Sequence, residues 1–124
     1  MTIETDILTT LNNDTDLSAI VSNRNYAVNL PQNPVYPNTV NSRVNSNPTN
    51  TLSGRNKLMN IRLQIDVRHT VLEKATDAAN KVISAMEKSI LFTALYLTDN
   101  HLPKENQTDT YRISIDFSVW FTET

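Results

Sequence analysis

The sequence predicts an α+β domain: a mostly antiparallel sheet of about four to five strands, with one long helix packed on one face and short N-terminal helices. Residues 59–69 and 111–121 alternate apolar and polar side chains, which is the period of a strand with one buried face. Between them, residues 70–90 place apolar side chains at helical spacing. Helices gathered on one face of such a sheet define the α+β class.

Two short helices are predicted at the start of the chain. The Asn12–Asn13–Asp14 cluster ends a first run of apolar residues at helical spacing, made of Ile3, Ile7, Leu8 and Leu11. Asp14, Thr15 or Asp16 then caps a second helix. The apolar residues of this second helix are Leu17, Ile20 and Val21.

Residues 23–38 are predicted to form an extended crossing, because prolines remove donors and favour extended geometry before them. Tyr26 and Val28 fit a brief edge strand. The alternation from Thr39 to Asn47 predicts a longer strand.

Two polar stretches are predicted as long loops. Residues 45–57 hold the only glycine, Gly54, and almost no apolar side chain; a solvated hairpin tip is the alternative interpretation. Residues 98–109 form the second predicted loop, after a short strand over 92–98.

The long helix is predicted to begin at Thr70, with Glu73 completing a capping box. Small residues on its apolar stripe favour close packing against the sheet. The stripe consists of Val71, Ala75, Ala78, Val82 and Met86, flanked by Leu72, Ala79, Ile83 and Ile90.

Composition excludes several classes of protein. The 124 residues suit one domain, 1–124, with a net charge of −2, which argues against a nucleic-acid binder. With no cysteine, disulfides and thiolate chemistry are excluded. No apolar run is long enough for a membrane helix, and the acidic N-terminus does not resemble a signal peptide. We therefore expect a protein made in a reducing cytoplasm.

Candidate catalytic chemistry is sparse. His69 with Asp66, or His101 with Asp99, offers only two metal ligands, whereas a catalytic metal site needs about three. Asp66 and Asp116 form a conceivable acid/base pair, but nearby arginines make cross-strand ion pairs the better interpretation. We predict no catalytic, cofactor-binding or metal-binding residue.

Binding chemistry is better represented. Charges of opposite sign on the two predicted loops suit contacts between different surfaces of identical subunits. The alternative is that both loops are solvated and have no relation to each other. The acidic side of that pattern is Asp99, Glu105 and Asp109. Trp120 lies on the polar face of the closing strand, either as an interface anchor or folded over its own sheet. The predicted interface residues are Arg43, Arg55, Lys57, Arg62, Asp66, Arg112, Asp116 and Trp120.

Over nearly its whole length the chain resembles the tail completion, or tail terminator, proteins of long-tailed bacteriophages. The resemblance includes the opening 1–7 segment, the Leu17–Ser18–Ala19–Ile20–Val21 turn and the Leu30–Pro31–Gln32 crossing. It continues through Arg62–Leu63–Gln64–Ile65–Asp66–Val67 and is strongest over 111–120. The Asn/Thr-rich 45–57 stretch and the scarcity of glycine depart from the family pattern.

The resemblance implies a structural virion protein at the head–tail junction. Such proteins form a ring, commonly a homohexamer, that caps the head-proximal end of the tail tube and offers a surface to the neck proteins of the head. The implied partners are further copies of the chain, the tail tube protein and the head or neck connector protein. DNA passes through such a ring, and a neutral or acidic lumen would not retain it.

Three alternatives remain open at this stage. One is a neck adaptor that contacts the head connector. Another is a small non-viral α+β accessory domain that binds a protein or metabolite. The third is a metal-dependent hydrolase that uses His69 and Asp66.

Overall fold

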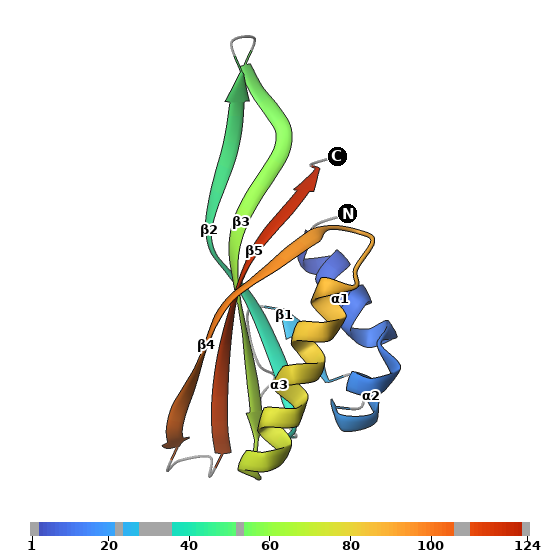
Figure 1. Ribbon diagram of the computed structural model, residues 1–124, viewed down its shortest axis with the longest axis vertical. Coiled ribbons are helices and arrows are strands. Elements are labelled where there is room, and N and C mark those ends of the chain that lie inside the picture. Colours follow the sequence, from blue (N-terminus) through green and yellow to red (C-terminus); the bar gives the residue numbers. More distant parts are fainter. Residues whose placement is uncertain (1–2, 22–23, 28–35, 52–53, 106–109, 123–124) are drawn as a thin grey trace.

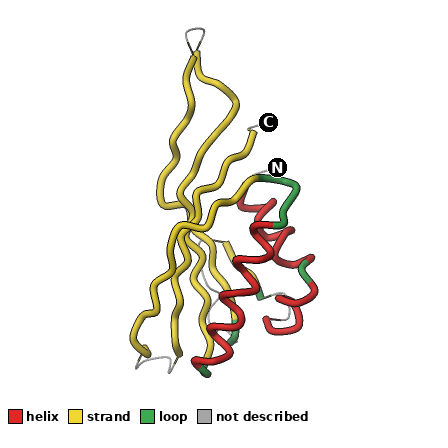
Figure 2. Tube along the Cα trace, viewed as in Figure 1, coloured by secondary structure: helices red, strands yellow, loops and turns green. Residues whose placement is uncertain are grey.

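The computed structural model describes residues 3–21, 24–27, 36–51, 54–105 and 110–122. Over these ranges the fold is α+β, with one mostly antiparallel sheet and its helices gathered on one side, as the sequence predicts (Figure 1, Figure 2). The helices are α1 (Ile3–Asn13), α2 (Thr15–Val21) and α3 (Leu72–Glu87). The strands are β1 (Asn25–Ala27), β2 (Asn38–Thr51), β3 (Gly54–His69), β4 (Thr93–Glu105) and β5 (Thr110–Thr122).

The strand order of the sheet is β1-β2-β3-β5-β4. Only the β1–β2 pair is parallel; the other three pairs are antiparallel. Strand β5 therefore lies inside the sheet, between β3 and β4, and its buried side chains form part of the core. The brief strand predicted around Tyr26 is present as the edge strand β1, whereas Val28 lies outside the described residues.

A long hairpin replaces the first predicted loop. The pairing of β2 with β3 continues to Thr51 opposite Gly54, so the prediction of a loop over 45–57 was wrong (Figure 1). The polar composition misled because a hairpin pairs through its main chain, which polar side chains permit, and Pro48, which has no N–H, lies at a register shift in β2. Of the two interpretations offered for this stretch, the hairpin was the better one.

The second predicted loop was also largely wrong, because β4 extends to Glu105. Pro103 is tolerated because β4 is an edge strand, where a missing donor need not break the ladder. The pairing of β4 with β5 also shifts register between Leu102 and Glu105.

The long helix begins later than predicted and has no capping box. Its N-cap is Val71, which makes no side-chain cap hydrogen bond. The turn at Thr70 moves the helix start to Leu72, so that Thr70 and Glu73 are not placed at N-cap and N3. The main-chain N–H of Val71 instead donates to Nδ1 of His69 at 3.0 Å. At the other helix junction, Asp14 is the cap: its Oδ1 accepts from the N–H of Leu17 at 2.9 Å.

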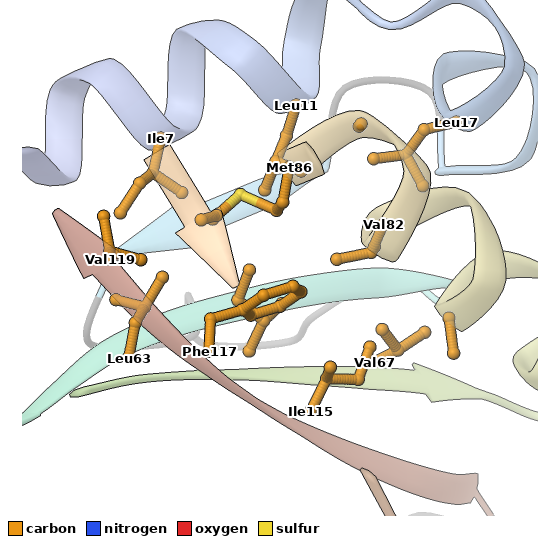
Figure 3. Close-up of a cluster of buried hydrophobic side chains, with 14 of the residues drawn as sticks. Ile7, Leu11, Leu17, Leu63, Val67, Val82, Met86, Ile115, Phe117 and Val119 are labelled. Carbon is orange, nitrogen blue, oxygen red and sulfur yellow. The ribbon is translucent and has the colours of Figure 1, made fainter. Parts of the chain in front are cut away.

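The core lies between the helices and one face of the sheet (Figure 3). Small alanines on α3 bring it close to the sheet, as predicted, whereas Val71, Leu72 and Ile90 of the predicted stripe are exposed. The apolar faces of β3 and β5 are buried as the alternation predicts. The fully buried side chains of these two strands are Ile61, Leu63, Ile65, Val67, Ile113, Ile115, Phe117 and Val119.

Candidate interaction surface

The face of the sheet that points away from the helices carries the polar sets of β3 and β5. Because successive side chains alternate, burying Ile61 to Val67 on one face directs Arg62, Gln64 and Asp66 to the other. Asp116 and Trp120 on β5 share that open face by the same alternation. Five of the eight predicted interface residues lie there: Arg62, Asp66, Arg112, Asp116 and Trp120.

Arg62 and Asp116 form the cross-strand ion pair that the sequence favours. Nη2 of Arg62 lies 3.2 Å from Oδ2 of Asp116. The pair is diagonal, because Arg62 is in register with Ser118 and Asp116 with Gln64. The arginine side chain is about half exposed, so the pair contributes little stability, at most about 1 kcal/mol.

Asp66 is held by neutral donors. Its Oδ1 accepts hydrogen bonds from the Ser114 hydroxyl at 2.5 Å and from Nε2 of Gln64 at 3.0 Å. The register places Asp66 opposite Ser114 and not opposite Asp116, so the two carboxylates do not face each other as an acid/base pair. Arg68 and Arg112 are directly opposed, and each has further interactions.

Arg43 joins the sheet to the helices. Its Nη2 lies 3.0 Å from Oε1 of Glu4 on α1, with both side chains partly exposed. The sequence indicated a charge at Arg43 but not this partner, which depends on the position of α1 over the sheet. Arg55 and Lys57 lie further along the hairpin, on β3, and their side chains are outside what the structure describes.

The acidic residues proposed to complement these charges lie on β4. Asp99 and Glu105 belong to that strand, and Asp109 is outside the described residues. Asp99 accepts from the Tyr96 hydroxyl and lies 3.0 Å from Nε2 of His101. The Tyr96 hydrogen bond, aided by His101 and opposed by burial, lowers the pKa of Asp99, and the same bond raises the pKa of Tyr96.

Trp120 has an apolar neighbour that sequence reasoning did not single out. Trp120 is in register with Thr93, and Ser118 with Leu95, so Leu95 and Trp120 are diagonal neighbours on the open face. Leu95 is 53% exposed, and Trp120 is half-buried. Together they form an apolar strip at the β4 edge of the sheet. Neighbouring Leu97 is also exposed, beside a register shift in β4.

Neither histidine belongs to a metal-binding cluster within the described ranges, where no group of three or more His, Asp or Glu side chains converges. His69 is buried at the end of β3 with its Nδ1 turned to the Val71 N–H, away from a shared site with Asp66. Burial, followed by the positive charges of Lys74 and Arg24, lowers the pKa of His69. In the same ranges, no helix has the length and apolar character needed to cross a bilayer.

Comparison with known proteins identifies the fold and family. Residues 5–122 match the family model described as "Tail completion protein gp17". The fold is similar to a chain of the solved structure "Virion of native gene transfer agent (GTA) particle", with a TM-score of 0.72 and 18% identity. The alignment covers 97% of this chain and 94% of that one. No curated protein matches the sequence.

Proposed function

The chain belongs to the tail completion protein gp17 family, so it is a structural protein of the phage virion tail, and we propose that it forms a ring that caps the tail tube and joins it to the head. The observation that carries this proposal is the family match over residues 5–122, nearly the whole chain. The ring is most simply a homohexamer. Its partners are the tail tube protein on one side and the head or neck connector protein on the other.

The open edges of the sheet support assembly through different surfaces of identical subunits. Strand β4 forms one edge along its whole length. At the other edge, the three-residue β1 pairs only with Thr39 to Asn41, which leaves the rest of β2 without a strand on that side among the described residues. Contacts between two different surfaces close into a ring when the rotation per subunit is correct.

Contacts between different surfaces also explain how the growth of the tail tube would stop. A tube grows while each added ring offers the next ring a matching surface. A subunit that binds the end of the tube on one side, and offers the neck a different surface on the other, stops that growth. The net charge of −2 per chain suits a ring whose lumen lets DNA pass without retaining it.

Electron microscopy of particles assembled without this protein tests the proposal. We expect separate heads and tails, with tail tubes longer than normal. Complementation with the intact chain should restore joined particles of normal tail length. Particles of normal length and assembly in its absence would rule out the proposal.

A second measurement distinguishes a tail terminator from a neck adaptor. The purified chain is mixed separately with the tail tube protein and with the head connector protein, and complexes are measured by sedimentation. We expect binding to the tube protein. Binding to the connector alone would make the chain a neck adaptor.

A further inference from the structure

The distal part of the β2–β3 hairpin projects away from the body of the protein (Figure 1). We name this part, residues 45–51 of β2 and 54–58 of β3, the arm. The last pair between β3 and β5 is Leu58 with Thr122, so β3 continues beyond its other partner strand. On the opposite side, β1 pairs with β2 no further than Asn41. Beyond Pro48 of β2 and Leu58 of β3, the arm is therefore two-stranded, with no neighbouring strand on either edge in the described residues.

A two-stranded hairpin with no further support is only marginally stable in water. Its unpaired main-chain N–H and C=O groups form hydrogen bonds readily with another surface. The twelve residues of the arm also include few large apolar side chains. The arm therefore favours a polar docking surface over an apolar cleft.

The charges of the arm and of the helical layer are opposite. The arm carries Arg55 and Lys57 and no acidic residue. The helical layer, α1 with α2 over residues 3–21, carries no Lys or Arg; its acidic residues are Glu4, Asp6, Asp14 and Asp16. One contact of this kind is present within the subunit, where Arg43 on β2 pairs with Glu4 at 3.0 Å.

The end of the helical layer is hollowed. A depression of about 400 Å³ lies between the C-terminal part of α1 and the segment that follows α3. The Thr10 and Ser89 hydroxyls, 3.2 Å apart, join its two sides. Its lining is mostly apolar, with Leu91 and the 98% exposed Ile90, and also includes the amine of Lys88, the carboxylate of Asp14 and polar side chains such as Asn13. Ile90 and its neighbour Leu91, which is 45% exposed, form a small apolar patch beside the hollow that a docked chain would cover.

We infer that, within the proposed ring, the arm of each subunit docks on the acidic surface of the helical layer of the next subunit, next to the hollow beside Ile90. This inference rests on the proposed function, because it specifies how neighbouring subunits are joined. The occupant is a second copy of this chain. It brings a basic segment with free main-chain groups to an acidic surface bearing amide and hydroxyl side chains.

Charge-swap variants test the inference. The arm variant carries Arg55→Glu and Lys57→Glu; the layer variant carries Asp6→Lys and Asp16→Lys. A control, Lys74→Glu with Lys81→Glu on α3, has the same charge change as the arm variant away from the arm. Asp14 is left intact because it caps α2. Circular dichroism establishes folding, and sedimentation velocity measures ring assembly.

We expect the arm variant and the layer variant each to assemble into rings only at a subunit concentration about tenfold or more above the one that the unmodified chain needs. Loss of charge pairs at other protein interfaces weakens binding by at least this much. The control should assemble normally. Mixing the two variants should restore even-numbered rings, because the basic arm of the layer variant then meets an unmodified acidic layer, and the acidic arm of the arm variant meets a layer in which two carboxylates are replaced by lysines. A chain carrying all four substitutions should also assemble.

Three results would overturn the inference in distinguishable ways. If the unmodified chain stays monomeric at all concentrations, the ring itself fails, and the arm contact with it. If the unmodified chain forms rings and both variants do so equally well, the proposed function stands and the arm contact is wrong. If the arm variant assembles normally but loses binding to a fluorescent DNA duplex, the arm contacts nucleic acid instead.

Discussion

The Ser114 hydroxyl donates to Oδ1 of Asp66, directly across the β3–β5 ladder. The same hydroxyl accepts from Nε2 of Gln64 at 2.8 Å, and Gln64 also donates to Asp66. Three neighbouring polar side chains thus satisfy one another on the open face. This arrangement fixes the orientation of Asp66 through its Oδ1, and His69, whose Nδ1 accepts from the Val71 N–H, is not part of it.

Removing the Ser114 hydroxyl should lower stability. Ser114 is buried, so Ser114→Ala leaves Asp66 and Gln64 each without one hydrogen-bond partner, at a cost of about 1–2 kcal/mol. Urea denaturation measures this change in the free energy of unfolding. Ser84→Ala, at an exposed position on α3, is the control and should change it by less than about 0.5 kcal/mol. Equal effects of the two substitutions would contradict the prediction.

Ile115→Asp should prevent folding. Ile115 is fully buried under the helices, and an unpaired carboxylate there costs several kcal/mol, a large part of the total stability of a small domain. Ile115→Val keeps the apolar character and should cost only about 0.5–1.5 kcal/mol. Soluble expression and circular dichroism distinguish the two variants. A folded Ile115→Asp protein would mean that this face of β5 is not the core face.

The missing cap of α3 gives a stabilising substitution. Val71 is the exposed N-cap residue and makes no side-chain cap bond, so Val71→Ser should add an acceptor for the first-turn N–H groups and raise stability by about 1 kcal/mol. Thr70→Ala should have little effect, because Thr70 is not the cap. Thermal unfolding compares the two. If Thr70→Ala cost as much as a lost cap, the capping box predicted from the sequence would form in solution.

The sequence predicted the elements that are buried better than the elements that are polar. The alternation of 59–69 and 111–121 identifies β3 and β5 because burial on one face imposes a period of two. The arm and the outer part of β4 carry no such period in their sequence, although main-chain pairing places both in the sheet. Composition alone therefore made both of them appear to be loops.

The candidate site was predictable only in part, for a similar reason. Alternation placed Arg62, Asp116 and Trp120 on one face, and the diagonal ion pair follows from adjacent strands. The Arg43–Glu4 pair depends on the position of α1 over the sheet, which a sequence pattern does not contain. The neighbours Leu95 and Trp120 depend on the register between β4 and β5.

Trp120→Ala should weaken assembly more than folding of the subunit. Trp120 lies on the open face beside exposed Leu95, where a neighbouring subunit would cover both. Phe121, the next residue, packs against the core, so Phe121→Ala is a matched control that should mainly lower the melting temperature of the dilute subunit. Sedimentation and thermal unfolding separate the two effects. If Trp120→Ala lowers the melting temperature as much as Phe121→Ala and leaves assembly unchanged, Trp120 packs within its own subunit and is not an interface residue.

His69 should make stability depend on pH. Burial, Lys74 and Arg24 lower its pKa in the folded protein below the ordinary value of 6.5. The unfolded chain therefore binds a proton at a higher pH than the folded chain does. This contribution to stability is complete above about pH 7.5, falls as the pH drops through 6.5, and becomes constant below the folded pKa.

The substitution His69→Asn tests this dependence, because an asparagine Oδ1 can accept the Val71 N–H bond that Nδ1 accepts in the native chain. The free energy of unfolding is measured by urea denaturation at intervals from pH 5 to 8 for both proteins. Other groups titrate in both proteins alike, so the difference between the two curves isolates His69. We expect the native protein to lose more stability than the variant as the pH falls. Parallel curves would show that His69 has the same pKa in the folded and unfolded chains, and hence that its burial does not oppose protonation.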